Sequence, residues 1–429
     1  MTPADELAAD YAELSLEILA SGIITDPYAD GRPRFRREPV VLSPREAREL
    51  GEVGRQVAAL YEEAVQLCYD DPELLDEFFG LTPVQKAMFL GSRPMWHGIA
   101  RADVFRTAQG YAVAELNCDT PTGQPEAVVL GRIAGAHHPK LIDPNADLGS
   151  HFVAMVETVV ARLCGPLQSS GAARTAGFVY PTEFSEDLSL IRLYKQWLED
   201  AGWSIVLGSP YNLSRRDGDP TARMFDEPLS LVVRHYKTDW WSERASAFKG
   251  EAFPDTAALI EPLDIVLRAQ AAARTAVVNP FGAVLPQNKR TMAFFWEHIH
   301  RFTLHSQERI ANLIPQSARL EALHPAMVLG QRSEWVLKSD YGAEGDEVVI
   351  GALVSDEEWA RSYEQARGGR WIAQRYFEAE TDALGACVNY GVFVVAGAPA
   401  GIYARVHVGA TDVHSASAPV LIDPSLGRA

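Results

Sequence analysis

The segment Arg101–Gly123, RADVFRTAQGYAVAELNCDTPTG, constrains the fold of this chain most strongly. It reads as two short strands joined by a turn, with acidic and amide side chains inside an apolar pattern. Glu115, Asn117 and Asp119 are spaced by two, so on an extended strand they share one face. Asp103 would reach the same face from the neighbouring strand. The segment therefore predicts a hairpin that presents several oxygen atoms on one side of a sheet.

Such oxygen atoms are the ligands that a magnesium ion carrying a nucleotide phosphate requires. Arg101 lies on the same face as Asp103 and would meet a phosphate oxygen. A polar strand edge facing solvent is the alternative, and short motifs alone do not decide between the two.

The length of 429 residues is enough for two or three packed units with a sizeable core. Lys and Arg number 39 and Asp and Glu number 57, which gives a net charge of −18. This charge argues against a surface built to bind nucleic acid or an anionic membrane. An anionic ligand in a local basic pocket remains compatible with it.

The N-terminal segment MTPADELAADYAELSLEILASG lacks the basic start and apolar run of a secretory signal. No window approaches the ~20 apolar residues of a membrane span. The four cysteines are scattered without paired spacing, which is typical of a reducing compartment and gives no zinc site. His137 and His138 are adjacent and would diverge on a helix. We therefore expect a cytoplasmic protein.

Apolar periodicity predicts helices in the first third and alternating helices and strands after residue 150, which indicates an α/β fold. A loop or hairpin is expected at 211–228, and the small, polar tail after Val408 is expected to be partly mobile. The expected helices are 3–20, 44–67, 83–91, 125–136, 151–163, 186–201, 286–302 and 356–365. The expected strands are 176–180, 204–207, 229–235, 277–278, 335–338, 347–350, 371–376, 388–395 and 401–408.

Five segments occur in a fixed order: ELNCDTPTG, NPFGAVLPQNK, WVLKSDYGAEGDEVVIG, WIAQRYFEAE and GVFVVAGAPAGIYARVH. Together they resemble the synthetase domain of glutathionylspermidine synthetase and its stand-alone relatives, which are ATP-grasp ligases. The resemblance covers about residues 80 to 410 and leaves no room for the amidase domain of some members. It implies an ATP-grasp fold with several α/β subdomains around an ATP cleft.

The resemblance implies that Asp103, Glu115 and Asn117 bind Mg²⁺. It implies catalytic roles for two arginines that stabilise the reacting phosphates, namely Arg101 and Arg405. An ordinary exposed strand residue is the structural alternative for Arg405.

The same resemblance implies that Lys289 and Lys338 hold the phosphates of ATP and that Gln374 lies where a hinge strand reads the adenine. Gly342 and Gly345 punctuate a loop that would close as a lid. Lys289 capping its own turn, or pairing with a surface acid, is the structural alternative. Relatives often have a proline after the second lysine and an arginine in the loop, whereas this chain has SDYGAEGDE there.

On the substrate side, the resemblance implies hydroxyl contacts from Thr120, Thr122 and Thr238, and an acidic contact near Glu186. Gly123 stands where the family can have a cysteine. The resemblance therefore does not identify glutathione as the substrate.

These observations predict an ATP-dependent ligase that forms a C–N bond between a small-molecule carboxylate and an amine. An acyl phosphate would be the intermediate, and ADP and phosphate would be released. A silent nucleotide-binding regulator and a phosphotransferase that releases a phosphorylated product are the alternatives, and a homodimer is left open. The expected units are a helical region at 1–90, a metal-binding hairpin and helix at 91–145, a substrate-side subdomain at 146–285 and an ATP-clamping subdomain at 286–429.

Overall fold

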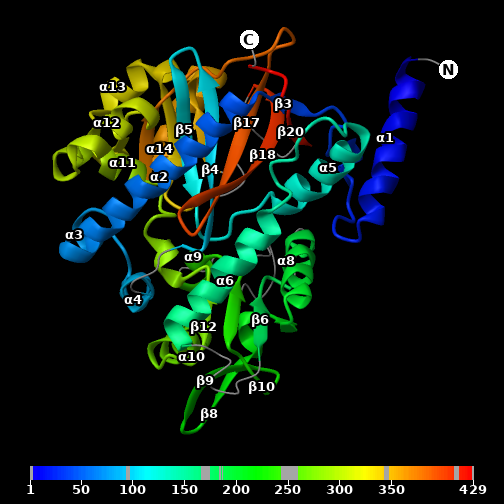
Figure 1. The fold of residues 1–429 in the computed structure, drawn as a ribbon. Helices are drawn as coiled ribbons and strands as arrows, with labels where there is room; N and C mark the ends of the chain where they lie inside the picture. Colours follow the sequence, from blue (N-terminus) through cyan, green and yellow to red (C-terminus); the bar gives the residue numbers. More distant parts are fainter. Residues whose placement is uncertain are drawn as a thin grey trace.

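The computed structural model describes residues 3–92, 97–165, 174–182, 185, 187–242, 259–342, 347–409 and 415–427. In Figure 1 a parallel sheet (green) lies below a larger sheet whose strands are coloured cyan and orange-red. Helices cover both sheets, so the α/β class expected from the sequence is confirmed.

An antiparallel five-stranded sheet of order β19-β18-β17-β4-β5 is the centre of the molecule. Its strands come from distant parts of the chain, and Figure 1 shows the cyan pair beside the orange-red pair. The strands are β4 (Ile99–Thr107), β5 (Gly110–Asn117), β17 (Ala386–Val395), β18 (Ala398–Val408) and β19 (Ala416–Ala418).

Helix α2 (Pro44–Asp70) packs across one face of this sheet. Its start is fixed by a capping box, in which the Glu46 amide donates to the Ser43 hydroxyl at 3.2 Å and the Ser43 amide donates to the Glu46 carboxylate at 2.7 Å. A Cβ on Gly54 would lie 2.7 Å from Cγ1 of Val392, so glycine permits the close approach of helix and sheet. The opposite face carries buried apolar side chains such as Ile99 and Phe393 together with the polar side chains of the β4–β5 hairpin.

A second antiparallel sheet has the order β13-β16-β14-β15. Trp335, Leu337 and Ala373 on one of its faces pack with Trp359 and Tyr363 of the following helix. Strand alternation directs Lys338 to the other face. The elements are β13 (Ser317–Arg319), β14 (Trp335–Ser339), β15 (Val348–Ile350), β16 (Trp371–Arg375), α11 (Arg290–Glu297), α12 (Leu304–Leu313), α13 (Pro325–Gly330) and α14 (Asp356–Ala366).

A parallel sheet of order β12-β11-β6-β7 forms the lower layer of Figure 1. Because β7 and β11 lie on opposite sides of β6, the strand order reverses there, and such a reversal opens a crevice at the carboxyl ends of the strands. The elements are β6 (Thr175–Val179), β7 (Ser204–Gly208), β11 (Leu231–Arg234), β12 (Ala276–Val278), α6 (Leu148–Cys164), α8 (Leu188–Asp200), α9 (Thr238–Ser242) and α10 (Ile260–Ala271).

The remaining elements are short or lie at the periphery. The excursion expected at 211–228 is a small antiparallel sheet of β8 (Leu213–Arg216), β9 (Asp219–Met224) and β10 (Glu227–Pro228). The others are α1 (Pro3–Ala20), β1 (Tyr28–Ala29), β2 (Arg32–Pro33), β3 (Val40–Leu42), α3 (Leu74–Glu77), α4 (Pro83–Gly91), α5 (Gln124–His137) and β20 (Val420–Ile422).

One expectation about secondary structure was wrong. The helix expected at 286–302 begins only at Arg290, because the Lys289 amide donates to the carbonyl of Asp340 at 2.8 Å instead of continuing a helix. In the described part of the tail, residues 416–418 extend the five-stranded sheet and residues 420–422 pair with β3 in parallel, while its partial mobility stays an expectation.

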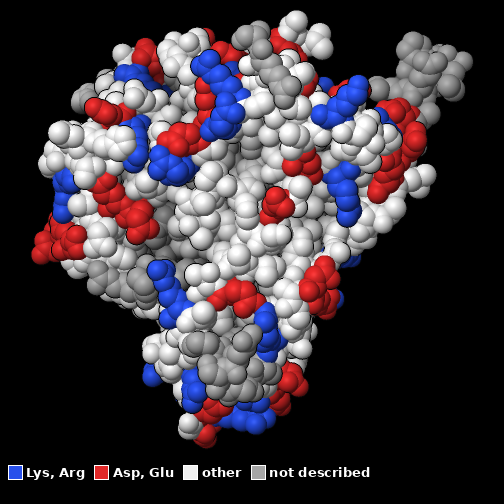
Figure 2. Space-filling view, viewed as in Figure 1, with Lys and Arg blue, Asp and Glu red and all other residues white. Residues whose placement is uncertain are grey.

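No helix in the part of the chain that the structure describes is long and apolar enough to span a membrane. On the face drawn in Figure 2, basic and acidic side chains are interspersed, and the basic ones do not gather into one continuous patch.

Candidate active site

The hairpin β4–β5 places two carboxylates opposite each other on the face of the central sheet that points away from α2. Asp103 is paired in register with Glu115, and the register shifts immediately after this pair. The shift marks a β-bulge that leaves Ala114 without a partner residue on β4. The carbonyl of Ala114 accepts a hydrogen bond from Nζ of Lys338 at 3.1 Å. The bulge therefore joins the hairpin to the second sheet at the level of the two carboxylates.

Arg101 and Asp103 form a buried two-bond ion pair. The guanidinium Nε and Nη2 of Arg101 donate to the two carboxylate oxygens of Asp103 at 2.7 and 3.0 Å. Arg101 also donates to the carbonyl of Thr122 at 2.8 Å. Arg405 approaches the same carboxylate from β18, with Nη2 3.7 Å from Oδ2 of Asp103. The structure thus brings both predicted catalytic arginines to one predicted metal ligand.

Gly391 makes room for this ion pair. It lies opposite Asp103 on β17, and a Cβ there would lie 2.7 Å from Cδ of Arg101 and 3.1 Å from a ring carbon of Tyr403. Any larger residue would press on the arginine that holds Asp103.

The two predicted phosphate-binding lysines converge on Glu115. Nζ of Lys289 lies 3.4 Å from Oε2 of Glu115 and also donates to the carbonyl of Gly342. Lys338 is 7% exposed and reaches the hairpin through Ala114. The structure therefore brings together Lys289 and Lys338, which are separated by about fifty residues in the chain.

Electrostatics keeps Glu115 ionised and weakens the hold of Lys338 on its proton. Burial alone would raise the pKa of Glu115, but Lys289, Lys338 and Arg101 outweigh burial and lower it to about 2. Burial lowers the pKa of Lys338 to about 8, although attraction to Glu115 opposes this shift. A mixed cluster of this kind is suited to holding a triphosphate with a divalent cation.

The residues present fit a magnesium ion. Asp103 and Glu115 supply carboxylates, and Asn117 donates its amide NH₂ to Glu115 Oε1 at 3.2 Å, which leaves its oxygen as the end that can ligate a cation. Magnesium binds through a few such oxygens and keeps several waters. No cluster of three His, Cys, Asp or Glu with metal-binding geometry occurs among the described residues, so the third protein ligand would be the amide.

Asp119 does not join this oxygen cluster as its spacing predicted. Strand β5 ends at Asn117, so the alternation stops before Asp119. The carboxylate of Asp119 turns to the layer of the parallel sheet, where it accepts from the Arg234 guanidinium and from the amide of Thr238 at 2.7 Å.

The loop after Lys338 is described as far as Gly342. The Gly342 amide donates to Oγ of Ser339 at 2.9 Å, and the hydroxyl of Tyr341 donates to the carbonyl of Val284 at 2.7 Å. Gly345 lies outside the described residues. Gln374 is 1% exposed and donates to Oγ of Ser317 at 3.1 Å, so its contact with adenine stays a prediction.

The predicted substrate contacts have different surroundings. Thr122 is exposed beside Arg101, and Thr120 is half-buried. Thr238 is completely buried, and its hydroxyl donates to Asp119 at 3.1 Å. Glu186 lies outside the described residues. The substrate roles of all four stay predictions.

Gly123 follows Thr122 with φ of +99°, a conformation that favours glycine. A Cβ at this position would lie 2.8 Å from a ring carbon of Tyr403. This geometry gives a physical reason for glycine where the family can have a cysteine.

Sequence reasoning missed the groups at the carboxyl ends of β6 and β11. Nε2 of His235, directly after β11, lies 3.0 Å from Oδ1 of Asp187, which follows β6. Asp239 lies in the next turn, where burial, with the charge of Asp119 as a further cause, raises its pKa to about 7. Position after a buried strand was the available signal for these groups, since functional side chains gather at such ends.

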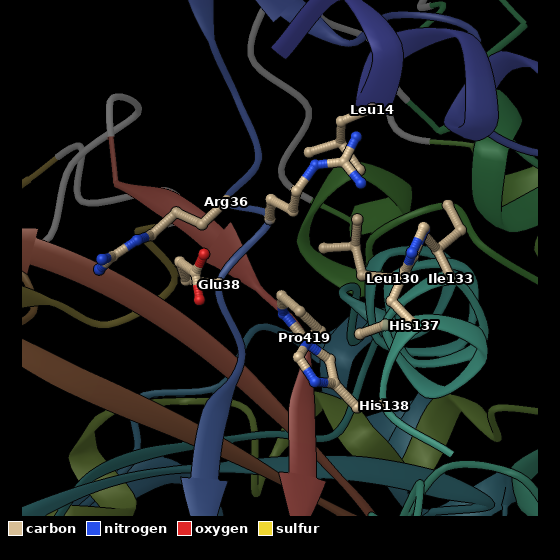
Figure 3. A pocket seen from close by; sticks show the side chains of 10 residues that line it. Leu14, Arg36, Glu38, Leu130, Ile133, His137, His138 and Pro419 are labelled. Carbon is tan, nitrogen blue, oxygen red and sulfur yellow. The ribbon is translucent and has the colours of Figure 1, made fainter. Parts of the chain in front are cut away.

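Figure 3 shows a separate cavity of about 120 Å³ between α1, α5 and residues 36–38. His137 and His138 lie at its rim, and Nε2 of His137 lies 3.1 Å from a carboxylate oxygen of Glu17. The cavity shares no lining residue with the cluster around Glu115.

The chain is similar to known proteins over most of its length. The family model described as glutathionylspermidine synthase preATP-grasp matches residues 21–423. No curated protein matches the chain. The apo structure of a glutathione synthetase-like effector from Globodera pallida shares 13% identity at a TM-score of 0.61, covering 98% of this chain and 97% of the other. A putative gamma-glutamylcysteine synthetase from Methylobacillus flagellatus shares 11% identity at a TM-score of 0.48, with 89% of each chain covered.

Proposed function

Because this chain belongs to the glutathionylspermidine synthase preATP-grasp family, we propose that it is an ATP-dependent ligase that joins a small-molecule carboxylate to an amine. Membership in this family supports an ATP-grasp fold and a synthetase type of activity. The amide product, the acyl-phosphate route and the use of magnesium are the proposed part.

The single observation that carries the proposal is the convergence of four cationic side chains on two facing carboxylates. Lys289 lies 3.4 Å from Glu115, and Arg405 lies 3.7 Å from Asp103. Arg101 and Lys338 complete the set. Transfer of a phosphoryl group spreads negative charge over several oxygens, and preorganised cations stabilise that charge.

The proposed reaction has two steps. A carboxylate oxygen of the first substrate attacks the γ-phosphorus of ATP, and the bond to the β,γ-bridging oxygen breaks to release ADP. The amine nitrogen then attacks the acyl carbon, phosphate leaves with the bonding electron pair, and the amine loses a proton. Lys289 and Lys338 would hold the phosphates during the first step. Arg101 and Arg405 would stabilise the charge that develops in both steps.

A bound magnesium ion would neutralise phosphate charge and orient the triphosphate. Asp103, Glu115 and Asn117 are the residues that would hold it. Because Glu115 remains ionised down to a pH of about 2, this carboxylate is available as a ligand throughout the physiological range.

The carboxyl ends of β6 and β11 are the proposed site of the second substrate. Ligands of open α/β sheets bind where the strand order reverses. The pair of Asp187 and His235 stands at this point, and Lys237 lies beside it with Nζ 4.9 Å from the ring centroid of Trp240. Positively and negatively charged groups at one point suit a substrate with both an amino and a carboxylate group.

The test is ADP formation by purified protein with Mg·ATP and pairs of amino acids, peptides and polyamines, with hydroxylamine added in a parallel arm. We expect one pair of substrates to release ADP and to give a condensed product that mass spectrometry detects. In the parallel arm, we expect the carboxylate alone to react with hydroxylamine and give a hydroxamate. Nucleotide binding without ADP formation across the screen would favour a silent binder. Accumulation of a phosphorylated product that no amine consumes would favour a phosphotransferase.

A matched pair of variants separates the site from the rest of the surface. Lys289→Met is expected to lower kcat/KM by roughly 10²- to 10³-fold, the usual effect of removing one preorganised donor. Lys195→Met is the control, because Lys195 forms an ion pair with Glu199 on α8 and both side chains are partly exposed. Equal effects of the two substitutions would contradict the proposed role of Lys289.

A further inference from the structure

The two peptide units that follow the metal-binding strand are held by side chains from another segment. The amides of Cys118 and Asp119 both donate to Oε1 of Gln287, at 2.8 and 3.0 Å. Their carbonyls both accept from Nδ2 of Asn279, at 3.0 and 2.9 Å. Two side-chain amides therefore satisfy all four polar backbone groups at this point, where the strand ladder has ended.

The carboxylate of Asp119 joins this end of β5 to the layer of the parallel sheet, which is the proposed substrate side. Its Oδ2 accepts from the amide and the hydroxyl of Thr238, at 2.7 and 3.1 Å, and its Oδ1 accepts from the Arg234 guanidinium. Nε of Arg234 in turn donates to the carbonyl of Asn279 at 3.0 Å. Asp119, Arg234, Thr238 and Asn279 are all buried. A buried ion pair with every bond made has little freedom to shift.

This junction lies between the predicted metal ligands and the predicted phosphate-binding lysine. Asn117 is the residue before Cys118, and Gln287 is two residues before Lys289. The Gln287 oxygen is thus a direct bridge between the strand that carries Glu115 and the turn that carries Lys289. If the Gln287 side chain moved, the distance between the predicted metal ligands on β5 and Lys289 would change, although Gln287 contacts neither the metal nor the phosphates.

We propose that Gln287 is a positioning residue for the metal and the nucleotide: its carboxamide oxygen fixes the end of β5 against the turn of Lys289. The inference rests on the proposed function, because it assigns Gln287 a role in the binding of Mg·ATP. Asp119 and Asn279 support the same strand end from the other layer. Groups that orient metal ligands from behind typically change metal affinity by roughly 10- to 100-fold when removed.

Three substitutions test this role. Gln287→Leu removes the acceptor for both amides, and Gln287→Glu retains an acceptor oxygen at the same reach. Thr275→Val is the matched control: the buried Thr275 hydroxyl accepts from the Ala222 amide at 3.2 Å and donates to the Leu229 carbonyl at 2.8 Å, within the substrate-side layer. The control therefore also loses two hydrogen bonds to backbone groups.

The readout is the gain in affinity for a non-hydrolysable ATP analogue when EDTA is replaced by Mg²⁺, measured by calorimetry. This ratio is taken on folded protein, so a loss of global stability alone leaves it unchanged. Gln287→Leu is expected to lower the ratio by roughly 10- to 100-fold, and Gln287→Glu to restore most of it. Thr275→Val is expected to keep the wild-type ratio while losing a similar amount of thermal stability.

A wild-type ratio in Gln287→Leu, or an equal loss of the ratio in Thr275→Val, would overturn the inference and leave the proposed function standing. Wild-type protein that binds no nucleotide in either condition would overturn the proposed function, and the inference with it. If Gln287→Leu does not fold, Gln287→Asn takes its place with the same expectations, because its oxygen lies one methylene short of the two amides.

Discussion

Replacement of Lys338 by methionine is expected to abolish nucleotide binding without weakening the fold. Burial lowers the pKa of Lys338 from 10.5 to about 8, and attraction to Glu115 recovers only part of the cost. A shift of this size corresponds to about 3 kcal/mol of net penalty for the ammonium in the folded state. The lysine is thus a charge that the fold holds at a cost, as expected of a functional group.

The penalty has a defined pH window. Below a pH of about 8 both the folded and the unfolded chain carry the Lys338 proton, so the penalty is fully present. Between about 8 and 10.5 the unfolded chain binds a proton that the folded chain does not, so this group makes stability rise with pH. Above 10.5 neither state is charged, and the penalty is gone.

The assay is thermal unfolding at pH 7 and pH 9.5, with nucleotide affinity measured by calorimetry. At pH 7, Lys338→Met is expected to melt at the wild-type temperature or a few degrees above it. The variant gains stability because the buried ammonium is removed, but it loses part of that gain because Glu115 has one cation fewer beside it. The advantage is expected to shrink at pH 9.5. A melting temperature several degrees below wild type at pH 7 would refute the reasoning and assign Lys338 a structural role.

Three further perturbations have defined outcomes. Glu115→Gln is expected to abolish Mg²⁺-dependent turnover and to lower the melting temperature at pH 7, because Lys289 and Lys338 lose the carboxylate that they keep ionised. Unchanged dependence on Mg²⁺ would contradict the metal role. Gly391→Ala is expected to lower kcat at least 10-fold and the free energy of unfolding by about 1–3 kcal/mol, because the new methyl group would lie 2.7 Å from Cδ of Arg101. Wild-type kinetics of this variant would show that Arg101 can move without loss of activity. We propose that Asp239, whose pKa burial raises to about 7, accepts the proton that the amine loses, so the rate is expected to fall as pH drops through about 7. An unchanged acid limb in Asp239→Asn would exclude this role.

The hairpin was predictable because its pattern is local. Alternation over residues 101–117 placed Asp103, Glu115 and Asn117 on one face, and the structure has them there. The same rule failed at Asp119, because alternation holds only while the strand continues and β5 ends at Asn117.

The lysines and the late arginine were assigned from the order of motifs along the chain. The structure brings Lys289, Lys338 and Arg405 to the hairpin, although their roles stay predictions. No local sequence pattern predicts the roles of Gln287 and Asn279, because each forms hydrogen bonds to backbone groups more than 150 residues away in sequence. Contacts of this kind depend on how three layers meet, which spacing within one segment does not encode.

A crystal structure with Mg²⁺ and a non-hydrolysable ATP analogue tests the central claim most directly. We expect a metal ion bound by oxygens of Asp103, Glu115 and Asn117, with the β- and γ-phosphates within hydrogen-bond distance of Lys289 and Lys338. A nucleotide bound elsewhere, with Glu115 still paired to Lys289 and no metal at the hairpin, would contradict it.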